Sequence, residues 1–370
     1  MKKSFFRKRI IALREKLPGI SPDTVWIIQP ENRRYLSGFK AEDNQLTESS
    51  GSLLINETGA LLLTDSRYTT EAQKEAIDFE VITLKNGLIE GIPDLLARLG
   101  TKILGFEKDY LTWGFHQQLA KKLKRLSPPV RLSPLNGLVE GMREVKDRSE
   151  IKVMEASADL MSQILDEVIE RLEPGRTERE IAWQIEALAR ETGAEGLAFS
   201  SIVASGPNSA LPHAVPTDRK IRVREPVILD VGLKIDGYCC DMTRTVFLER
   251  PGSGFREIYR TVRQAQLSAL QQIRAGMKST IPDSFARKVI KNAGFGEYFG
   301  HSLGHGVGLA IHERPRIGPG KPLELKTGMV VTVEPGIYIP GKGGVRLEEM
   351  VVITRDGPKI LTKDRHFYDF

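Results

Sequence analysis

The fold is decided by residues 227–246, which read VILDVGLKIDGYCCDMTRTV. Within this stretch, the dipeptide Asp236-Gly237 predicts a two-residue hairpin loop of type I′. In that register Gly232 lies opposite Asp241, Asp230 lies diagonally beside it, and the three positions share one face. Two carboxylates on an otherwise apolar strand pair are costly to bury unless a cation neutralises them. Taken alone, such a pair is more typical of a solvent-facing hairpin, so the interpretation depends on the rest of the chain.

The composition indicates a soluble globular protein of two domains. The chain has 370 residues, of which 40% are hydrophobic and 28% are charged, and its formal net charge is +6. The basic clusters near the N-terminus and at 121–125 carry no nucleic-acid motif, and no apolar stretch is long enough to span a membrane. We therefore expect neither nucleic acid nor a membrane as a partner. The only cysteines, Cys239 and Cys240, are adjacent, which favours a reducing cytoplasm over a disulfide framework.

Residues 1–130 predict an α/β domain without a catalytic constellation of its own. Apolar strand-like runs alternate with helical patterns along this part of the chain. The prolines of Ser127-Pro-Pro and Ser133-Pro then interrupt the pattern, which predicts a linker over 131–147 and a second domain over 148–370. Strands are predicted at 24–29, 52–55, 60–64, 79–83 and 102–106, and helices at 71–76, 93–99 and 113–123.

The second domain shows one order of elements that occurs twice. Capping boxes at Asp147–Glu150 and Thr177–Glu180 predict the starts of two helices, which strands follow. A second pair of helices and strands then repeats this order, which predicts a weak internal duplication with two similar halves that face a shared cleft. The second helix pair is predicted at 255–274 and 282–293, and the strands at 198–205, 227–246, 329–334 and 345–354.

Further chemistry-bearing residues follow in the second half of this domain. Residues 301–308, HSLGHGVG, contain too much glycine for a helix and predict a loop that brings backbone close to something bound. Glu334 ends a buried-looking strand, and Arg346 and Glu348 share one face of the next strand.

A metal site is favoured because two aspartates, one histidine and two glutamates occur together on separate predicted strands. A lone histidine is usually structural, and a strand-end glutamate is usually solvated. Four carboxylates and one imidazole make a hard, oxygen-rich site suited to two divalent ions such as Mn²⁺. Two such ions about 3.5–4 Å apart can share a hydroxide nucleophile. The candidate ligands are Asp230, Asp241, His305, Glu334 and Glu348.

These motifs carry a resemblance to a known family. The second domain resembles the pita-bread metallopeptidases, which include methionine aminopeptidase, prolidase, aminopeptidase P and creatinase. The first domain, with NRRYLSGF at 32–39 and TDSRY at 64–68, resembles the amino-terminal domain of the prolidase and creatinase branch. The resemblance implies an α+β protein, with a creatinase-type α/β N-terminal domain followed by a C-terminal pita-bread (creatinase/aminopeptidase) catalytic domain.

The resemblance also implies a role for each matched residue. Asp230 would bind one metal, His305 and Glu334 the other, and Asp241 and Glu348 would bridge both. Mn²⁺ is favoured, with Co²⁺ or Zn²⁺ as alternatives. Cys240, where the family commonly has serine, is expected to point away from Asp241 and pack in the core, and it raises a question of oxidation sensitivity. The implied catalytic residues are His213, His301, His312 and Glu334, and the implied substrate-side residues are the same three histidines with Arg346, which would also orient the carboxylate beside it.

The predicted function is hydrolysis of the X–Pro bond of short proline-containing peptides by a cytoplasmic homodimer. An Xaa-Pro dipeptidase is favoured because Arg316, four residues after His312, matches a prolidase arginine that contacts the free carboxylate of the dipeptide. An exposed loop arginine is the competing interpretation, and aminopeptidase P, which acts on longer peptides, is the alternative enzyme. Methionine aminopeptidases commonly lack this first domain. A non-catalytic binding module is disfavoured because such relatives lose ligands that are complete here.

Overall fold

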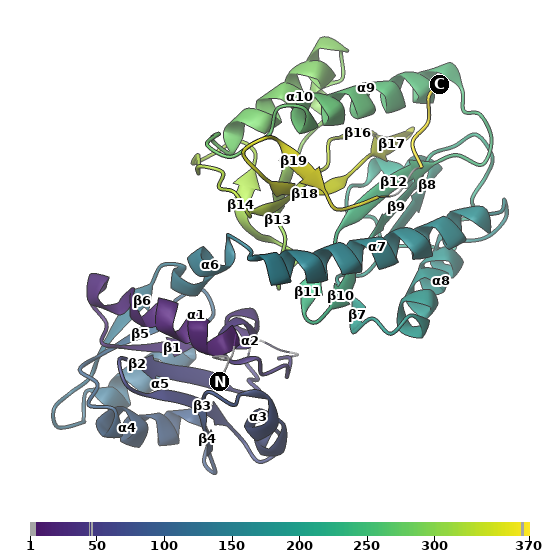
Figure 1. The fold of residues 1–370 in the computed structure, drawn as a ribbon. Coiled ribbons are helices and arrows are strands. Elements are labelled where there is room, and N and C mark those ends of the chain that lie inside the picture. The colour runs from purple at the N-terminus through teal and green to yellow at the C-terminus, as the bar shows by residue number, and fades with distance from the viewer. Residues whose placement is uncertain (1–4, 44, 46, 364–365) are drawn as a thin grey trace. The chain divides into compact units, whose positions relative to one another are not determined.

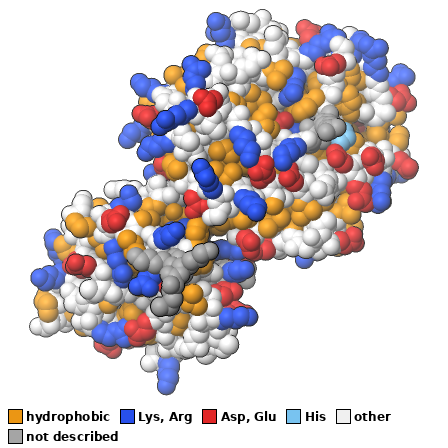
Figure 2. Space-filling view, viewed as in Figure 1, with side chains coloured by type: hydrophobic (Ala, Val, Ile, Leu, Met, Phe, Trp, Pro, Cys, Tyr) orange, Lys and Arg blue, Asp and Glu red, His pale blue; other side chains and the backbone are white. Residues whose placement is uncertain are grey.

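The computed structural model describes residues 5–43, 45, 47–363 and 366–370, and it contains two compact units, Met1–Met142 and Arg143–Phe370. Each unit has its own sheets and its own hydrophobic core. Within the described residues, no helix has both the length and the apolar character that crossing a membrane requires. On the face shown in Figure 2, Lys and Arg side chains are interspersed with Asp and Glu side chains.

The first unit is built around one six-stranded sheet with the strand order β4-β3-β2-β1-β5-β6 (Figure 1). The central strand β1 pairs antiparallel with β2 and parallel with β5. The strands are β1 Thr24–Ile27, β2 Ser52–Asn56, β3 Ala60–Thr64, β4 Glu80–Thr83, β5 Ile103–Glu107 and β6 Arg131–Leu135. The helices are α1 Phe5–Arg14, α2 Pro30–Ser37, α3 Thr69–Glu75, α4 Leu88–Arg98, α5 Trp113–Leu123 and α6 Leu138–Arg143, with a 3₁₀ turn at Leu17–Gly19.

Both faces of this sheet are buried. On one face, Trp26 and Leu54 join apolar side chains of α4 and α5 in a single core. The alternate residues Val25 and Leu53 are also fully buried, on the other face. This is the near-continuous apolar strand pattern expected for a sheet covered on both sides.

The prediction of a linker over 131–147 is wrong for residues 131–135. Residues 131–135 form β6, which pairs parallel with β5, and α6 follows before the boundary of the two units at Met142. Pro134 suggested a linker, yet β6 is an edge strand, where the missing N–H of proline costs no ladder hydrogen bond. A proline signal therefore marked a sheet edge rather than a domain boundary.

The second unit contains two helix pairs with strands between them (Figure 1). Its sheets have the orders β11-β10-β7, β12-β9-β8, β14-β13-β15-β18-β19 and β16-β17. The helices are α7 Arg148–Glu170, α8 Glu178–Glu191, α9 Ser253–Leu270 and α10 Thr280–Asn292, with 3₁₀ turns at Gly206–Ala210 and Gly296–Tyr298. The strands are β7 Gly196–Leu197, β8 Ile202–Ser205, β9 Val227–Val231, β10 Leu233–Ile235, β11 Tyr238–Cys239, β12 Met242–Val246, β13 Gly304–Gly306, β14 Glu313–Ile317, β15 Val330–Val333, β16 Gly336–Ile339, β17 Gly343–Arg346, β18 Glu349–Ile353 and β19 Pro358–Ile360.

The order of helix, helix and strands recurs as the sequence predicts. Both predicted capping boxes are present, at Asp147 with Glu150 before α7 and at Thr177 with Glu180 before α8. Helix α7 packs against β10 and β11, whereas α9 packs against β15 and β17. Each half therefore has its own helix layer over its own strands.

The hairpin at 227–246 has the predicted register but is not one continuous strand pair. Asp236 and Gly237 both have positive φ, and Ile235 pairs with Tyr238, as a type I′ loop requires. The ladder is interrupted at Gly232, where a Cβ would lie 2.3 Å from the carbonyl oxygen of Cys240. At Gly232 the backbones of the two strands of the hairpin approach closely, and the hairpin is divided between two sheets. Asp241 lies in the interruption between β11 and β12.

Candidate active site

All predicted site residues of the second unit line one cavity of about 870 Å³. A cavity of this size accommodates a small peptide rather than a folded protein segment. Apolar side chains, among them Phe199, Ile202 and Ile311, share the lining with the charged groups. The predicted residues in the lining are Asp230, Asp241, His305, Glu334, Glu348, His213, His301, His312, Arg316 and Arg346.

The first half of the unit contributes Asp230 from β9 and Asp241 from the break before β12. Asp230 accepts a 2.5 Å hydrogen bond at Oδ2 from Nη2 of Arg346. Its other oxygen, Oδ1, is buried and has no hydrogen-bond partner among the described residues. A buried carboxylate oxygen in this state indicates a missing positive or donor group.

The second half contributes Glu334, after β15, and Glu348, before β18. The register of β15 with β18 and of β16 with β17 places these two residues directly opposite each other. The predicted continuous strand over 345–354 is interrupted here, between β17 and β18. Glu348 accepts a 2.7 Å hydrogen bond from the hydroxyl of Thr243, and Glu334 accepts one of 3.1 Å from Thr332. These neutral donors orient the carboxylates without neutralising them.

His305 lies on β13 rather than in the predicted loop. The neighbouring glycines pack against strand backbone, since a Cβ at Gly304 would lie 2.1 Å from the carbonyl oxygen of Thr332 and one at Gly306 2.3 Å from that of Arg314. Glycine is therefore needed for close strand packing rather than for contact with a ligand. The register of β13 with β14 shifts between His305 and Gly306, a bulge of the kind that redirects side chains at sites.

The tautomer of His305 follows from its hydrogen bond. Nδ1 lies 3.1 Å from the carbonyl oxygen of Gly306, which can only accept, so Nδ1 carries the proton and Nε2 has a lone pair. Nε2 lies 3.5 Å from Oδ2 of Asp241 and 3.3 Å from Oε1 of Glu334. Burial lowers the pKa of His305 to about 4, so these contacts are not ion pairs at neutral pH. Lone pairs of three groups converge on one point, an arrangement that a cation would stabilise.

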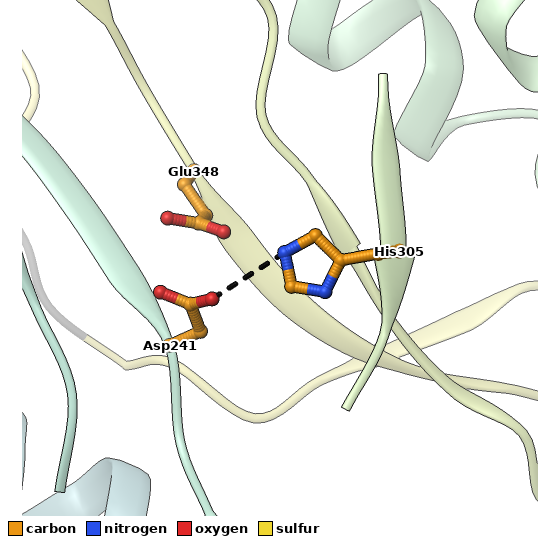
Figure 3. Close-up of side chains that lie close together, drawn as sticks. All are labelled: Asp241, His305 and Glu348. Carbon is orange, nitrogen blue, oxygen red and sulfur yellow. Dashed lines mark ion pairs between the residues drawn. The ribbon is translucent and has the colours of Figure 1, made fainter. Parts of the chain in front are cut away.

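Figure 3 shows that Asp241, His305 and Glu348 point toward a common centre from three different strand segments. Ligand atoms of these three side chains all lie within 4.8 Å of one another. Burial, with the neighbouring carboxylates, raises the pKa of Asp241 and Glu348 well above the usual range, and burial raises that of Glu334 to about 8. Glu334 contacts His305, a member of this cluster. Asp230 instead forms an ion pair with Arg346.

The three further histidines occupy different positions in the cavity. His312 packs edge-on against His305, with ring centroids 4.3 Å apart. His301 has Nδ1 2.8 Å from the carbonyl oxygen of Ser302, so its Nε2 accepts from the hydroxyl of Tyr338 at 3.0 Å. His213 is exposed in the loop after the 3₁₀ turn Gly206–Ala210.

The two arginines and the cysteine have separate environments. Arg346 is 3% exposed and donates to Asp230, Tyr338 and Thr243, so its guanidinium is committed to the protein. Arg316 is exposed, donates from Nε to the hydroxyl of Ser302, and has no ion-pair partner among the described residues. Cys240 is buried against Ser157 of α7, on the side away from the cavity, as alternation predicts.

Three residues that complete the arrangement were not predicted from the sequence. Thr243 and Thr332 each lie two positions from a carboxylate, Asp241 and Glu334 respectively, and alternation along a strand could have indicated them. Tyr338 donates to His301 and accepts from Arg346 at 2.8 Å. No sequence spacing relates Tyr338 to His301, because their contact depends on how distant strands pack.

Comparisons with known proteins give consistent results. Residues 152–355 match Metallopeptidase family M24, and residues 9–145 match the Creatinase/Prolidase N-terminal domain. The chain is 36% identical to the Xaa-Pro dipeptidase of Pyrococcus horikoshii over 357 residues, which is 96% of each chain. It is also similar to the solved structures of an Xaa-Pro dipeptidase from Bacillus anthracis (TM-score 0.90, 36% identity, 97% and 98% of the two chains) and an X-Pro aminopeptidase from Thermotoga maritima (TM-score 0.84, 36% identity, 95% and 98%).

Proposed function

Because the chain belongs to metallopeptidase family M24 and has a Creatinase/Prolidase N-terminal domain, we propose that it hydrolyses the Xaa-Pro bond of dipeptides with two divalent metal ions. The matches confirm the family, the pita-bread fold class and the hydrolase class that the sequence predicts. The observation that carries the proposal is the convergence of four carboxylates and one imidazole in a single cavity of peptide size.

The side chains fit divalent cations. Asp230 has a buried oxygen without a partner, and the lone pair of His305 faces two carboxylates. We assign Asp230, Asp241, His305, Glu334 and Glu348 as the ligands, and the oxygen-rich donor set favours Mn²⁺ over softer metals. Two divalent ions bound here would polarise the peptide carbonyl and activate water. Thr243, Thr332 and the backbone carbonyl of Gly306 hold the ligands in orientation, as is usual for such sites.

The histidines are proposed to act on the substrate rather than as ligands. His213 and His312 line the cavity beside the cluster, and His301 is held in one tautomer by Ser302 and Tyr338. Donors placed near a developing oxyanion contribute roughly 10²–10³ in rate. Arg346 holds Asp230 in place through its Nη2 hydrogen bond, so we assign it a positioning role.

Arg316 is proposed to bind the free carboxylate of the dipeptide. Arg316 lines the cavity and donates from Nε to the hydroxyl of Ser302, with no carboxylate partner among the described residues, and its planar fork suits bidentate pairing. Arg316 lies opposite His305 in the β13–β14 register, which places the charge beside the cluster. This position favours a dipeptidase. The likeness to the X-Pro aminopeptidase of Thermotoga maritima keeps longer peptides as the second candidate.

The first unit is proposed to restrict substrates to short peptides and to support a homodimer. Its match to the Creatinase/Prolidase N-terminal domain supports this assignment, and the two free cysteines are consistent with a reducing cytoplasm. Light scattering on the purified protein tests the dimer directly, and a monomer at the concentrations used for assays would contradict it.

A hydrolysis panel with added Mn²⁺ tests the proposed function. We expect rapid cleavage of Xaa-Pro dipeptides, slower cleavage of Xaa-Pro-Xaa tripeptides, and none of a Met-Ala-Ser peptide. Preference for the tripeptides would instead identify an aminopeptidase. Cleavage of Met-Ala-Ser alone would contradict Xaa-Pro specificity, and no cleavage of any peptide by the metal-loaded protein would contradict a peptidase function.

A further inference from the structure

Glu178, the first residue of α8, is a fully buried carboxylate that does not line the cavity of the candidate active site. Its two oxygens accept from five donor groups of the described residues: two backbone amides, two hydroxyls and one side-chain amide. All five donors are neutral. A charge buried among neutral donors is costly in folding, so the carboxylate must provide something that a neutral side chain would not.

The donors come from both ends of one segment, residues 205–217. At the first end, the backbone N–H and the hydroxyl of Ser205 donate to Oε1 of Glu178 at 2.7 and 2.8 Å. At the other end, the backbone N–H and the hydroxyl of Thr217 donate to Oε2 at 3.1 and 2.6 Å. The side-chain amide of Asn208 donates to both oxygens, at 3.2 and 3.0 Å. One carboxylate therefore joins the two ends of the segment.

The middle of this segment contributes to the wall of the cavity. Residues 212–216 line it, and they include His213. This part of the segment is mostly exposed: Ala214 is buried, whereas Leu211 and Val215 are 58% and 78% exposed. Because so little of the middle is packed into the protein, the attachment of the two ends has a large share in deciding where the ring of His213 lies.

A second attachment fixes the segment to β17. The backbone N–H of Gly344 donates to the hydroxyl of Ser209 at 2.8 Å, and Nη1 of Arg346 donates to the carbonyl oxygen of Pro212 at 3.1 Å. Nη2 of the same arginine donates to Asp230, a proposed metal ligand. The segment is therefore tied to the metal-site strand by Arg346 and to the start of α8 by Glu178.

We propose that Glu178 is a positioning residue, which holds residues 205–217 so that His213 faces the substrate. The inference rests on the proposed function, in which His213 acts on the substrate. A carboxylate suits this task because each of its oxygens accepts from one of the two backbone N–H groups. In glutamine an NH₂ group replaces one oxygen, so it would face a backbone N–H with a second donor and release one end of the segment.

Glu178→Gln tests the proposal in the metal-loaded, full-length protein. We expect kcat for an Xaa-Pro dipeptide to fall by about 10²-fold, as misplacement of an active-site group does, while KM and metal content change little. In the His213→Ala background, the same substitution should have almost no further effect, because it acts through His213. Losses that multiply in the double variant, or loss of metal from Glu178→Gln, would overturn the proposal.

Thr217→Val provides a milder variant that decides the matter if Glu178→Gln does not fold. It removes one hydroxyl donor from the same carboxylate, so we expect kcat to fall by about tenfold, and Thr217→Ser should restore it. Asp218→Asn is the matched control, because Asp218 follows Thr217 directly but forms an exposed ion pair with Arg179. Equal kcat values in Thr217→Val and Asp218→Asn would overturn the proposal.

Histidine NMR separates this inference from the proposed function. The chain has six histidines, and in protein labelled with ¹³C-histidine the His213 signal is identified by its absence in His213→Ala. We expect this signal to shift in Glu178→Gln and not in Asp218→Asn, with His116 of the first unit unchanged in both. An unchanged His213 signal in Glu178→Gln overturns the inference. A wild-type protein that cleaves no peptide contradicts only the proposed function, because the spectrum still shows whether Glu178 holds His213 in place.

Discussion

Glu348 and Glu349 are consecutive and almost fully buried, yet their surroundings are opposite. Glu349 forms an ion pair with Arg244 at 3.2 Å and accepts from the hydroxyl of Thr362. Glu348 faces Asp241 and Glu334, and among the described residues only the Thr243 hydroxyl is a hydrogen-bond donor to its carboxylate. The fold therefore neutralises one buried carboxylate and leaves its neighbour in an acidic cluster.

Two other buried carboxylates, like Glu349, have partners from the protein. Glu313, beside His312, pairs with both Arg143 and Lys146. Glu107, in the first unit, accepts from two backbone amides and from Asn32, although burial still raises its pKa to about 7. Burying a charge is costly unless it is paired, so structural carboxylates acquire partners during folding. Among the site carboxylates, Asp230 pairs with Arg346, whereas Asp241, Glu334 and Glu348 have no Lys or Arg ion-pair partner among the described residues; in our account, metal ions supply the remaining positive charge.

Glu348→Gln tests the unpaired member of the comparison and should have the largest effect. We propose that Glu348 bridges the two ions, as the family resemblance implies, so its loss should remove several kcal/mol of transition-state stabilisation and lower activity by about 10³-fold or more. The metal content should fall with it, while the thermal stability of the EDTA-treated protein should not decrease, because a repulsive group is removed. Kinetics, metal analysis and calorimetry measure the three effects. A fully active, fully loaded variant would contradict the bridging role.

Glu349→Gln tests the paired member. It leaves the buried guanidinium of Arg244 without its carboxylate, which should cost about 3–5 kcal/mol in the free energy of unfolding. Metal content should be unchanged. Urea denaturation of the metal-free protein measures the loss, with Glu155→Gln as the control, because Glu155 pairs with the exposed Lys359 and should contribute less than about 1 kcal/mol. Equal losses of unfolding free energy in the two variants would mean that burial does not determine how much an ion pair contributes to stability.

His301→Ala and His305→Ala extend the comparison to the histidines. Nε2 of His305 faces carboxylates, so its loss should remove metal. Nε2 of His301 accepts from the hydroxyl of Tyr338 and its Nδ1–H donates to the carbonyl oxygen of Ser302, so its loss should keep both ions but lower kcat by displacing Tyr338 at the wall of the cavity. His213→Ala should behave like His301→Ala. Metal analysis separates the two classes, and loss of metal in His213→Ala would make that residue a ligand.

Arg316→Ala should have the smallest effect and tests the carboxylate clamp. Loss of one charge-assisted pair should cost about 1.5–3 kcal/mol in kcat/KM for an Xaa-Pro dipeptide, expressed mainly as a higher KM. An amidated or extended substrate should be nearly unaffected. Arg314→Ala is the matched control, because Arg314 is exposed on the same strand but does not line the cavity. Equal losses on dipeptide and tripeptide would favour an aminopeptidase.

Local signals predicted the parts of the fold that depend on local geometry. Asp236-Gly237 fixed the hairpin register, because its positive φ angles admit only one loop type, and this register placed Asp230 and Asp241 on one face. The capping boxes at Asp147 and Thr177 likewise located two helix starts, because their hydrogen bonds join residues only three positions apart. Five of the strands of the first unit were likewise predicted within a few residues.

The errors concern features that depend on tertiary packing. Pro134 indicated a linker but lies in an edge strand, and the glycines around His305 indicated a ligand-binding loop but serve strand packing. The strand breaks at Gly232, where the two backbones of the hairpin approach closely, and between β17 and β18, before Glu348, were also not predicted. Neither the approach nor the contact of Tyr338 with His301 is encoded within a short window of sequence.

The most direct test of the account is the number of divalent ions that the acidic cluster holds. The protein is stripped with EDTA, reconstituted with Mn²⁺, separated from free metal by gel filtration and analysed by mass spectrometry. Our account predicts two ions per chain in the wild type and in Glu349→Gln, and fewer than two in Glu348→Gln. A wild-type protein that retains no metal, or a Glu348→Gln variant that retains two ions, would contradict the claim that unpaired buried carboxylates form a dinuclear metal site.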